Sequence, residues 1–591
     1  MATVTRDAPP GLRLSTAAGR WVLAATVLGS AIAAIDATVV GIALPAIGRD
    51  FDAQLSSLQW TVTGYTLTLT GLLLLGGALG DRFGRRRVYV VGVLAFAAAS
   101  ALCGVAPNIG FLILARALQG VGGALLTPGS LAILQASFAP GNRAAAIGAW
   151  SGLGGVATAL GPLLGGFLVQ VVSWRLIFFI NLPIAVVVVL IAARHVPETR
   201  KPPTGAPLDL AGGIFITAGL IGVTYAVIEG PSRGWHTGPV LLSLVAGILL
   251  LVVFAFRERR AADPLLPLGI FRTRQFMAIN LVTFVMYGAL GGALFLLPIQ
   301  LQQVLRYSPT AAGVSLLPVT VIMLLLSPRS GALAGLIGPR LQLSFGPLLV
   351  GAGMALMTRV GIGATYLTDV LPAVVVLGFG LATTVAPLTA TALSSAPAVH
   401  AGMASAVNND VARAGGLIAV AVLPPLAGLS GFAYLHPSSL NHGFHIAVVA
   451  CAIICAVAGV LAAFGIQNPR TATPAGRPSP RSCPIDSPPP PADDNQLADG
   501  STVASPSVGG YWRSDPAKPS SGGEADREHA GERARQATVA RHSETAGAYG
   551  GDDRLTAEAD IAKRRHVGVE DDVSGVPQAA PNVDAPPFDG D

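Results

Sequence analysis

Charged side chains inside long apolar segments are the residues of this sequence best placed to do chemistry. Asp36 lies in the apolar run that follows Arg20, and Arg116 lies in another run. A later run contains Asp410 and Arg413. An ionisable group in hydrocarbon is costly, so such residues usually mark functional sites in membrane proteins. A carboxylate beside a guanidinium in that setting can take up and release a proton.

The depths of Asp36 and Arg116 predict that the two side chains face each other. At a rise of 1.5 Å per residue, Asp36 lies about 22 Å from one edge of the hydrocarbon and Arg116 about 9 Å from the other. These depths nearly coincide in a core about 30 Å thick. Burial favours the neutral carboxyl group and a nearby guanidinium favours the carboxylate, a balance suited to proton coupling. A static pair that only orients helices is the alternative.

Asp410 and Arg413 form a second polar centre, preceded by Asn408 and Asn409. Their i, i+3 spacing allows them to meet on one helix face. Two interpretations stay open, a neutralised pair packed inside the protein and a role in coupling or substrate contact.

The composition argues against a large soluble enzyme. The chain of 591 residues is 52% hydrophobic and 12% charged, whereas soluble domains carry about 25% charged residues. Residues 1–466 hold 25 Lys and Arg against 12 Asp and Glu, and residues 467–591 hold 13 against 20. The basic balance is therefore an average over two unlike segments and does not indicate nucleic-acid binding.

The elements that must position these side chains are membrane-spanning helices, each needing about 20 apolar residues. We expect an all-α polytopic membrane protein whose first run is a retained helix and not a cleaved signal peptide. The fourteen predicted spans are 21–45, 59–79, 88–106, 111–133, 144–170, 174–193, 210–228, 238–256, 276–299, 309–327, 345–362, 370–393, 401–425 and 444–465.

Loop charge predicts the orientation. A cytoplasmic N-terminus makes loops 80–87, 139–143, 194–208, 257–275, 328–343 and 394–400 cytoplasmic. Together these loops hold far more basic residues than the opposite loops, which predicts that both termini are cytoplasmic. We divide the chain into an N-terminal segment (1–20), a six-helix half (21–193), two inserted helices with their loops (194–275), a second half (276–466) and a tail (467–591). The tail is rich in Pro, Ser, Gly and Ala and is predicted to be disordered. The tail can have a regulatory or docking role or be dispensable, and both interpretations stay open.

An internal repeat supports two homologous halves. The pattern G-A-L-x4-G-x-R begins at Gly77 and again at Gly331, and each copy is expected in a short cytoplasmic loop. Two similar halves around a central site are a common transporter architecture. The first copy either anchors the cytoplasmic side or forms a gating cluster of salt bridges. Its residues of interest are Gly77, Gly80, Asp81, Arg82, Gly84, Arg85 and Arg86.

The run 144–170 is rich in glycine, which permits close helix packing, and a Gly-Pro step can bend a helix. Either a moving hinge or static packing explains Gly152, Gly161, Pro162, Gly165 and Gly166.

Motifs for other chemistry are missing from the sequence. No G-x-x-x-x-G-K-[ST] occurs, so the chain carries no P-loop ATPase of its own. Cys451 and Cys455 are four residues apart, and small apolar side chains in a helix are a simpler interpretation than a metal pair. We expect neither an enzyme nor a metal site.

Several stretches in chain order resemble the fourteen-helix drug:proton antiporters of the major facilitator superfamily, the EmrB/QacA type. They are 35–45, 77–87, 112–120, 152–166 and 174–183, and the resemblance covers about residues 15–466. The stretch 152–166 is similar to the antiporter motif of the fifth helix. The chain departs from the family pattern at Gly41, Gly335 and Asp410.

The resemblance implies a proton-coupled antiporter of the cytoplasmic membrane that exports small organic compounds by alternating access. Arg116 then matches the family's arginine associated with proton coupling, with Asp36 as its partner. The expected partners are an amphipathic or cationic substrate, protons and the lipid bilayer, with no nucleic acid. No cofactor is expected, because the proton gradient supplies the energy. An importer or facilitator on the same fold is the alternative, and a membrane receptor or enzyme is a more remote one.

Overall fold

The computed structural model describes residues 11–200, 209–261, 264–266, 268–395 and 401–468. Fourteen of its helical spans are long and apolar enough to cross a membrane, and they coincide with the fourteen predicted spans. Residues 469–591, nearly all of the predicted tail, lie outside the described part, as do residues 1–10.

The spans form two groups of six around an inserted pair. The first group contains α1 (Ala17–Asp50), α2 (Leu55–Phe83), α3 (Arg85–Gly104), α4 (Ile109–Ser137), α5 (Pro140–Val171), and α6 (Leu176–Phe179) with α7 (Asn181–His195). The inserted pair is α8 (Leu210–Arg233) and α9 (Gly238–Arg260). After η1 (Leu268–Arg272), the second group contains α10 (Arg274–Gln303), α11 (Pro309–Ser315) with α12 (Leu317–Ile337), α13 (Pro339–Leu356) with η2 (Met357–Arg359), η3 (Tyr366–Val370) with α14 (Leu371–Ser394), α15 (Ala401–Leu426), and, after η5 (Ala433–Leu435), α16 (Pro437–Gly465).

The prediction that the two repeat copies lie in loops is wrong. Residues 77–83 belong to α2 and residues 331–337 belong to α12. Only Gly84 and Gly338 interrupt the helices, with φ values of +111° and +83°. Helical hydrogen bonding continues past the hydrocarbon until a residue leaves the right-handed conformation, and glycine does so without a steric penalty.

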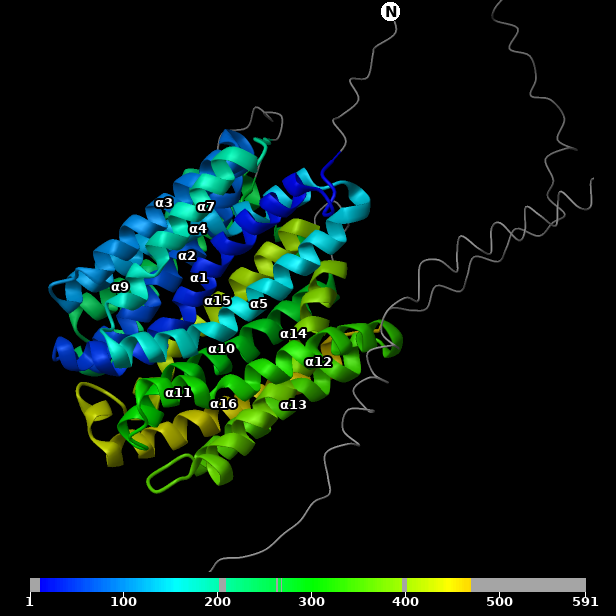
Figure 1. Cartoon of the computed structure of the whole chain (residues 1–591). Coiled ribbons are helices and arrows are strands. Elements are labelled where there is room, and N and C mark those ends of the chain that lie inside the picture. Colours follow the sequence, from blue (N-terminus) through cyan, green and yellow to red (C-terminus); the bar gives the residue numbers. More distant parts are fainter. Residues whose placement is uncertain (1–10, 201–208, 262–263, 267, 396–400, 469–591) are drawn as a thin grey trace, which may run out of the picture. The chain divides into compact units, whose positions relative to one another are not determined.

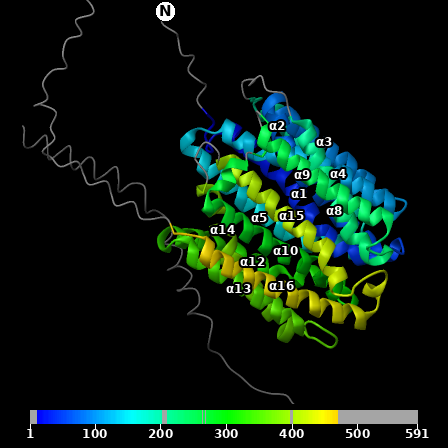
Figure 2. The ribbon, with the colours of Figure 1, turned by 180° about the vertical axis from the view of Figure 1, so that it is seen from behind.

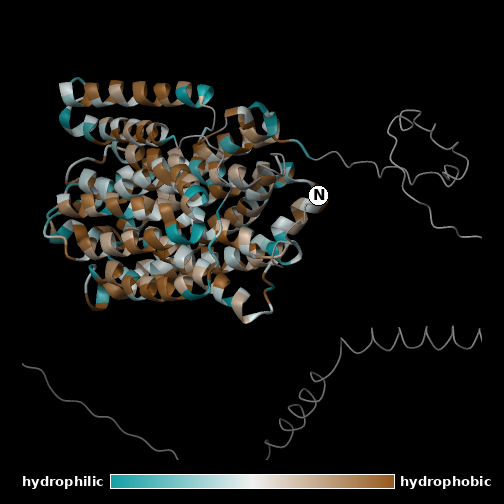
Figure 3. Ribbon diagram, turned by 90° about the horizontal axis from the view of Figure 1, so that it is seen from above, coloured by the Kyte–Doolittle hydropathy of each residue, from teal (hydrophilic) through white to brown (hydrophobic). Residues whose placement is uncertain are grey.

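The two groups of helices lie side by side. Figure 1 shows the first group in blue to cyan and most of the second group in green to yellow. The inserted pair packs beside α2 (Figure 2), where Thr217 contacts Gly71 and Leu75 contacts Gly213. Hydrophobic residues cover most helices (Figure 3), and many are exposed on α9, including Leu242 at 71%. Such an apolar surface fits hydrocarbon and not water.

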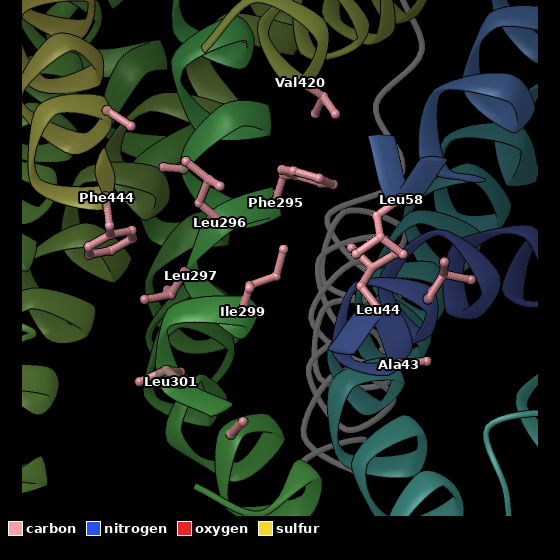
Figure 4. Packing of buried hydrophobic residues seen from close by; sticks show 14 of the residues in the cluster. Ala43, Leu44, Leu58, Phe295, Leu296, Leu297, Ile299, Leu301, Val420 and Phe444 are labelled. Carbon is pink, nitrogen blue, oxygen red and sulfur yellow. The ribbon is translucent and has the colours of Figure 1, made fainter. Parts of the chain in front are cut away.

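Each span has one end at each of two opposite faces of the helix bundle. We call one face the arginine-rich end, because it holds Arg20, Arg82, Arg143, Arg194, Arg257, Arg272 and Arg340 at helix termini. The opposite end holds the loops 51–54, 105–108, 172–175, 304–308 and 427–436. A buried apolar cluster near the opposite end contains side chains of both groups, with Leu44 and Leu58 from one and Phe295, Ile299 and Val420 from the other (Figure 4).

Glycines bring α3 and α4 together at backbone distance. A methyl group added to Gly122 of α4 would lie 2.7 Å from the Cα of Phe96. A methyl group added to Gly92 of α3 would lie 2.7 Å from the backbone nitrogen of Leu126. Small residues are the usual means of close helix approach in membranes, where lipid removes the hydrophobic drive between helices.

Gly122→Ala should therefore lower the stability of the folded protein by about 1–3 kcal/mol, because the backbone of α3 must move. The thermal midpoint of the purified protein, followed by tryptophan fluorescence, measures the loss. Gly148→Ala in α5 is the matched control, since a methyl group there meets no atom within 4 Å. Equal midpoints for the two variants would contradict the packing argument.

Candidate functional site

A buried network joins α1 to α4 at the predicted pair. The Nη1 atom of Arg116 donates to Oδ2 of Asp36 at 2.6 Å. Both residues are only 1% exposed. The structure thus places the two side chains face to face, as their depths predict. Paired in this way, neither charge is buried alone, which would cost several kcal/mol.

Gln119 completes the contacts of the carboxylate. Its Nε2 atom donates to Oδ1 of Asp36 at 2.8 Å, and its Oε1 atom accepts from Nη1 of Arg116 at 2.7 Å. Gln119 lies one turn after Arg116 on α4, so both residues point to the same face. The Sγ atom of Cys103 lies 3.6 Å from Oε1 of Gln119. Each oxygen of Asp36 therefore has one donor, and all three polar side chains are satisfied together.

The helix α2 holds the other side of Arg116. The Nε atom of Arg116 donates to the carbonyl oxygen of Thr61 at 3.1 Å. The Cζ atom of Arg116 lies 4.4 Å from the centre of the Tyr65 ring. The Tyr65 hydroxyl is buried with no hydrogen-bond partner among the described residues. Tyr65 thus covers the guanidinium with its ring while its own polar group stays unsatisfied.

Asp410 and Arg413 do not form the ion pair that their spacing permits. Among the described residues, Oδ1 of Asp410 and Nε of Arg413 are buried atoms without a hydrogen-bond partner. The spacing places both on one face of α15, but side-chain rotamers decide whether the groups touch. These two residues are therefore the less satisfied of the two predicted centres.

The two asparagines before Asp410 have different surroundings. Asn408 is buried and donates to Asn280 at 3.2 Å and to Thr283 at 2.8 Å, both on α10. Asn409 is exposed and donates to the carbonyl oxygen of Ser405 at 3.2 Å. Asn408 fastens α15 to α10, whereas Asn409 is available to a ligand.

The first repeat copy makes contacts that hold the turn between α2 and α3. Arg85 contacts Oδ1 of Asp81 at 2.8 Å and donates to the carbonyl oxygen of Ala132 at 3.2 Å. Glu198 accepts from the backbone nitrogens of Arg86 at 3.1 Å and Arg87 at 3.2 Å. Glu198 therefore caps the first turn of α3, where the helix dipole favours a negative charge. Gly77, Gly80 and Arg82 lie in α2, and Gly84 separates α2 from α3.

The second copy repeats this arrangement with a different residue. The backbone nitrogen of Arg340 donates to Oδ1 of Asn468 at 3.0 Å. Nε of Arg340 donates to the carbonyl oxygen of Ala463, and Nη1 of Arg86 donates to that of Val196. In each half, the residues around the end of the sixth span close the turn between the second and third spans. This correspondence agrees with the internal repeat.

The glycine-rich helix α5 touches both halves near the opposite end. Gly161 and Gly165 pack against Thr38 and Val39 of α1. A methyl group added to Gly166 would lie 2.8 Å from the Cα of Thr310, in α11 of the second half. Pro162 contacts Gly313 of α11. These residues provide close packing at this end.

Hydrogen bonds between the halves, among the described residues, lie near the opposite end. Gln59 donates to the carbonyl oxygen of Val420 at 2.7 Å, and Gln302 donates to that of Ile42 at 2.9 Å. Tyr434 donates to the carbonyl oxygen of Ala53 at 2.7 Å. Together with the apolar cluster, these contacts close the opposite end.

Towards the arginine-rich end, the same face of α5 has open space beside its glycines. Gly155 precedes Gly166 by about three helical turns and so lies on the same face. A methyl group added to Gly155 or to Gly152 would meet no atom within 4 Å. The face that packs tightly on α11 near one end is thus uncovered near the other.

The described ranges hold no group of three or more His, Cys, Asp or Glu residues that could bind a metal ion. Cys451 and Cys455 are free and buried, and the Sγ atom of Cys455 lies 3.8 Å from Sδ of Met354.

Sequence reasoning missed Gln119, Glu198, Gln59 and Gln302 as site residues. A polar side chain in an apolar run, one turn from Arg116, was a usable signal for Gln119. Glu198 follows the sixth predicted span by a few residues, and only the fold brings it to the start of α3.

Comparisons with known proteins agree with this architecture. The family model of the Major Facilitator Superfamily matches residues 26–421. The chain is 36% identical over 432 residues to the Tetracenomycin C resistance and export protein of Streptomyces glaucescens, covering 72% of this chain and 79% of that protein. It is 38% identical over 463 residues to the Puromycin resistance protein pur8 of Streptomyces alboniger, covering 75% and 90%.

A solved structure shares the fold at low sequence identity. It is a bacterial homologue of the human lysosomal transporter Spinster, in an inward-facing and unoccupied conformation. The TM-score is 0.56 at 16% identity, and the match covers 76% of this chain and 97% of that one. With the family match, the relatives and the fourteen apolar helices, the chain belongs to the Major Facilitator Superfamily and is a multi-pass membrane transporter.

Proposed function

We propose that this transporter is a proton-coupled antiporter that exports small organic compounds. The observation that carries the proposal is the buried network of Asp36, Arg116 and Gln119. Such groups are costly in a membrane and occur where ions or protons are handled. The proton gradient is the energy source, and no cofactor takes part. The importer or facilitator alternative has no contact here that favours it.

Asp36 is the proton-carrying group in this proposal. As a carboxylate it accepts from Arg116 and Gln119. When Asp36 binds a proton, the electrostatic attraction between its carboxyl group and the Arg116 guanidinium becomes weaker. Arg116 still has Oε1 of Gln119 and the carbonyl oxygen of Thr61 as acceptors, so its charge keeps two partners. Protonation of Asp36 therefore weakens the contact between α1 and α4, while Arg116 keeps its other hydrogen-bond acceptors.

The helix α1 connects the proton site to the closed end. Ile42 lies six residues after Asp36, or about 9 Å along the helix, and its carbonyl oxygen accepts from Gln302 of the second half. Thr38 and Val39 pack on α5, which contacts α11. A shift of α1 on protonation thus acts directly on contacts that hold the halves together. Proton and substrate are coupled when each prefers a different arrangement of these halves.

In this proposal the helices span the cytoplasmic membrane and the arginine-rich end faces the cytoplasm, because basic residues concentrate in cytoplasmic loops of membrane proteins. Both termini are then cytoplasmic, and the arrangement described above is open inward. A substrate enters between the halves near Gly155, and the outward state requires the contacts of Gln59, Gln302 and Tyr434 to break.

The substrates are small organic compounds of amphipathic or cationic character. The relatives named above are an export protein for tetracenomycin C and a puromycin resistance protein. Asp410 has a buried oxygen without a partner among the described residues, and Asn409 beside it is exposed. We assign Asp410 and Arg413 to substrate contact or to a second step of coupling.

Asp36→Asn should abolish gradient-driven transport. Asparagine keeps an acceptor for Arg116 but binds no proton in the physiological range. Accumulation of puromycin and tetracenomycin C in inverted vesicles, with and without an imposed pH gradient, measures the loss. Transport by the variant should equal the level without a gradient, while exchange of labelled for unlabelled compound continues.

Asp50→Asn is the matched control for this experiment, because Asp50 lies on the same helix and pairs with Arg175 at the opposite end. It should transport like the native protein. Unchanged gradient-driven transport in Asp36→Asn would place the proton site elsewhere, with Asp410 as the next candidate.

The open end predicts a pattern of thiol labelling. Gly155→Cys, in a Cys483→Ser background, should react with a membrane-impermeant maleimide added to inverted vesicles. Ala312→Cys should stay protected, since Ala312 is 0% exposed at the closed end. The reverse pattern would contradict the inward-open assignment.

A further inference from the structure

A second pair of acidic side chains is buried outside the network, between the inserted helices. Asp209 directly precedes α8 and is 6% exposed, and Glu258 lies in the last turn of α9 and is 3% exposed. Oδ1 of Asp209 accepts from the backbone nitrogen of Gly212 at 2.9 Å and from Nε of Arg257 at 2.8 Å. Oε2 of Glu258 accepts from the backbone nitrogen of Leu266 at 3.2 Å.

The remaining oxygen of each carboxyl group has no partner. Oδ2 of Asp209 and Oε1 of Glu258 are buried and make no hydrogen bond to any described residue. Both border one small space beside Gly212, where an added methyl carbon would lie 2.7 Å from Oδ2 and 3.3 Å from Oε1. The two unsatisfied oxygens therefore lie on the same side of Gly212, no farther from each other than the sum of these two distances.

The charges around this space do not balance. Among the described residues, Arg257 is the cation bonded at this site, and its contact is with the other oxygen of Asp209. The helix α2, which packs on the start of α8, presents the apolar side chain of Leu75 to Gly213. Within the described part of the chain, two carboxylates and one guanidinium leave a net negative charge in this buried site. Two carboxylates in one such site do not both ionise, because burial and mutual repulsion favour a proton on one of them.

We propose that Asp209 and Glu258 bind one proton between them, as an O–H donor on one carboxyl and an acceptor oxygen on the other. A proton needs only the two free oxygens. Hard metal cations such as Ca²⁺ take about 6–8 oxygen ligands, and the other two carboxyl oxygens are occupied. The shared proton removes the net charge and satisfies both oxygens at once.

This proton site stabilises the packing of the fold and does not take part in transport. It holds together the start of α8, the end of α9 and, through Leu266, the segment that leads to α10 of the second half. Loss of the proton would force Glu258 away from Asp209 and release Leu266. The attachment of the second half to the inserted pair is then sensitive to pH at the arginine-rich end, whether or not Asp36 carries the transported proton.

The thermal midpoint of the purified full chain as a function of pH tests the proposal. The folded state holds a proton that an unfolded carboxyl group, with a pKa of about 4.3, loses early. Stability from this site is therefore present at low pH and falls as pH rises. In Glu258→Gln the carboxamide donates to Asp209 at every pH, so the midpoint should fall less with rising pH than in the native chain.

Glu229→Gln is the matched control, because it removes one carboxylate of α8 at the opposite end, where Glu229 pairs with Arg233. It should keep the native pH dependence. The same dependence in Glu258→Gln as in the native chain would overturn the proposal. A midpoint at fixed pH that rises with added Na⁺, Mg²⁺ or Ca²⁺ in the native chain, but not in Glu258→Gln, would show a metal ion in place of the proton.

Infrared spectra give a second measurement that does not depend on how well one variant folds. The native protein should show the carbonyl band of a protonated carboxyl group that disappears at high pH. At neutral pH the band should lose the contribution of one carboxyl group in Glu258→Gln and also in Asp209→Asn, whose amide can donate to Oε1 of Glu258, while Asp36 and Asp410 can contribute equally to the band in all three proteins. An unchanged band in either folded variant, or the absence of the band from the native protein, would contradict a shared proton.

Discussion

A bilayer offers no water to a buried charge, and this constraint organises the first half of the protein. Arg116 is acceptable in α4 only because Asp36, Gln119 and the carbonyl oxygen of Thr61 surround it. That set requires α1, α2 and α4 to lie close together. Gly120 meets the requirement, since a methyl group there would collide with the backbone of Tyr65. The glycines of α4 thus allow the close helix packing that brings the partners of Arg116 within reach.

The same helix that carries the carboxylate also joins the two halves. Asp36 faces α4, whereas Ile42, further along α1, accepts a hydrogen bond from Gln302. Among the described residues, two glutamines, Gln59 and Gln302, make the side-chain hydrogen bonds between the halves to backbone oxygens inside the spans. Neutral amides can leave such acceptors at a lower cost than ion pairs can separate, since a hydrogen bond contributes about 0.5–1.5 kcal/mol net. In the part of the chain that the structure describes, the hydrogen bonds that join the halves at the closed end are therefore neutral and individually weak.

The sequence predicts much of this architecture, for identifiable reasons. The length of apolar runs determines the fourteen spans, and the depth of Asp36 and Arg116 within them brings the pair together. The sequence is a poorer guide to contacts that depend on side-chain rotamers or on loops distant in the chain. The spacing of Asp410 and Arg413 permits an ion pair that their side chains do not make. The ends of α2 and α12 extend further than apolarity suggests, because backbone hydrogen bonding does not stop at the hydrocarbon edge. Glu198 and Asn468 lie beyond the last helix of their halves, where no periodicity signals a partner.

The matching positions of Glu198 and Asn468 bear on how such a protein arose and how it can be divided. If each half descends from one duplicated gene segment, that segment encoded the residues that follow its sixth helix and return to its third. A split of the chain at His195, where α7 ends, would separate the first half from the carboxylate that closes its own interhelical turn. A split after Thr199 would retain it. The segment that makes all these contacts within itself is therefore slightly longer than the segment that crosses the membrane.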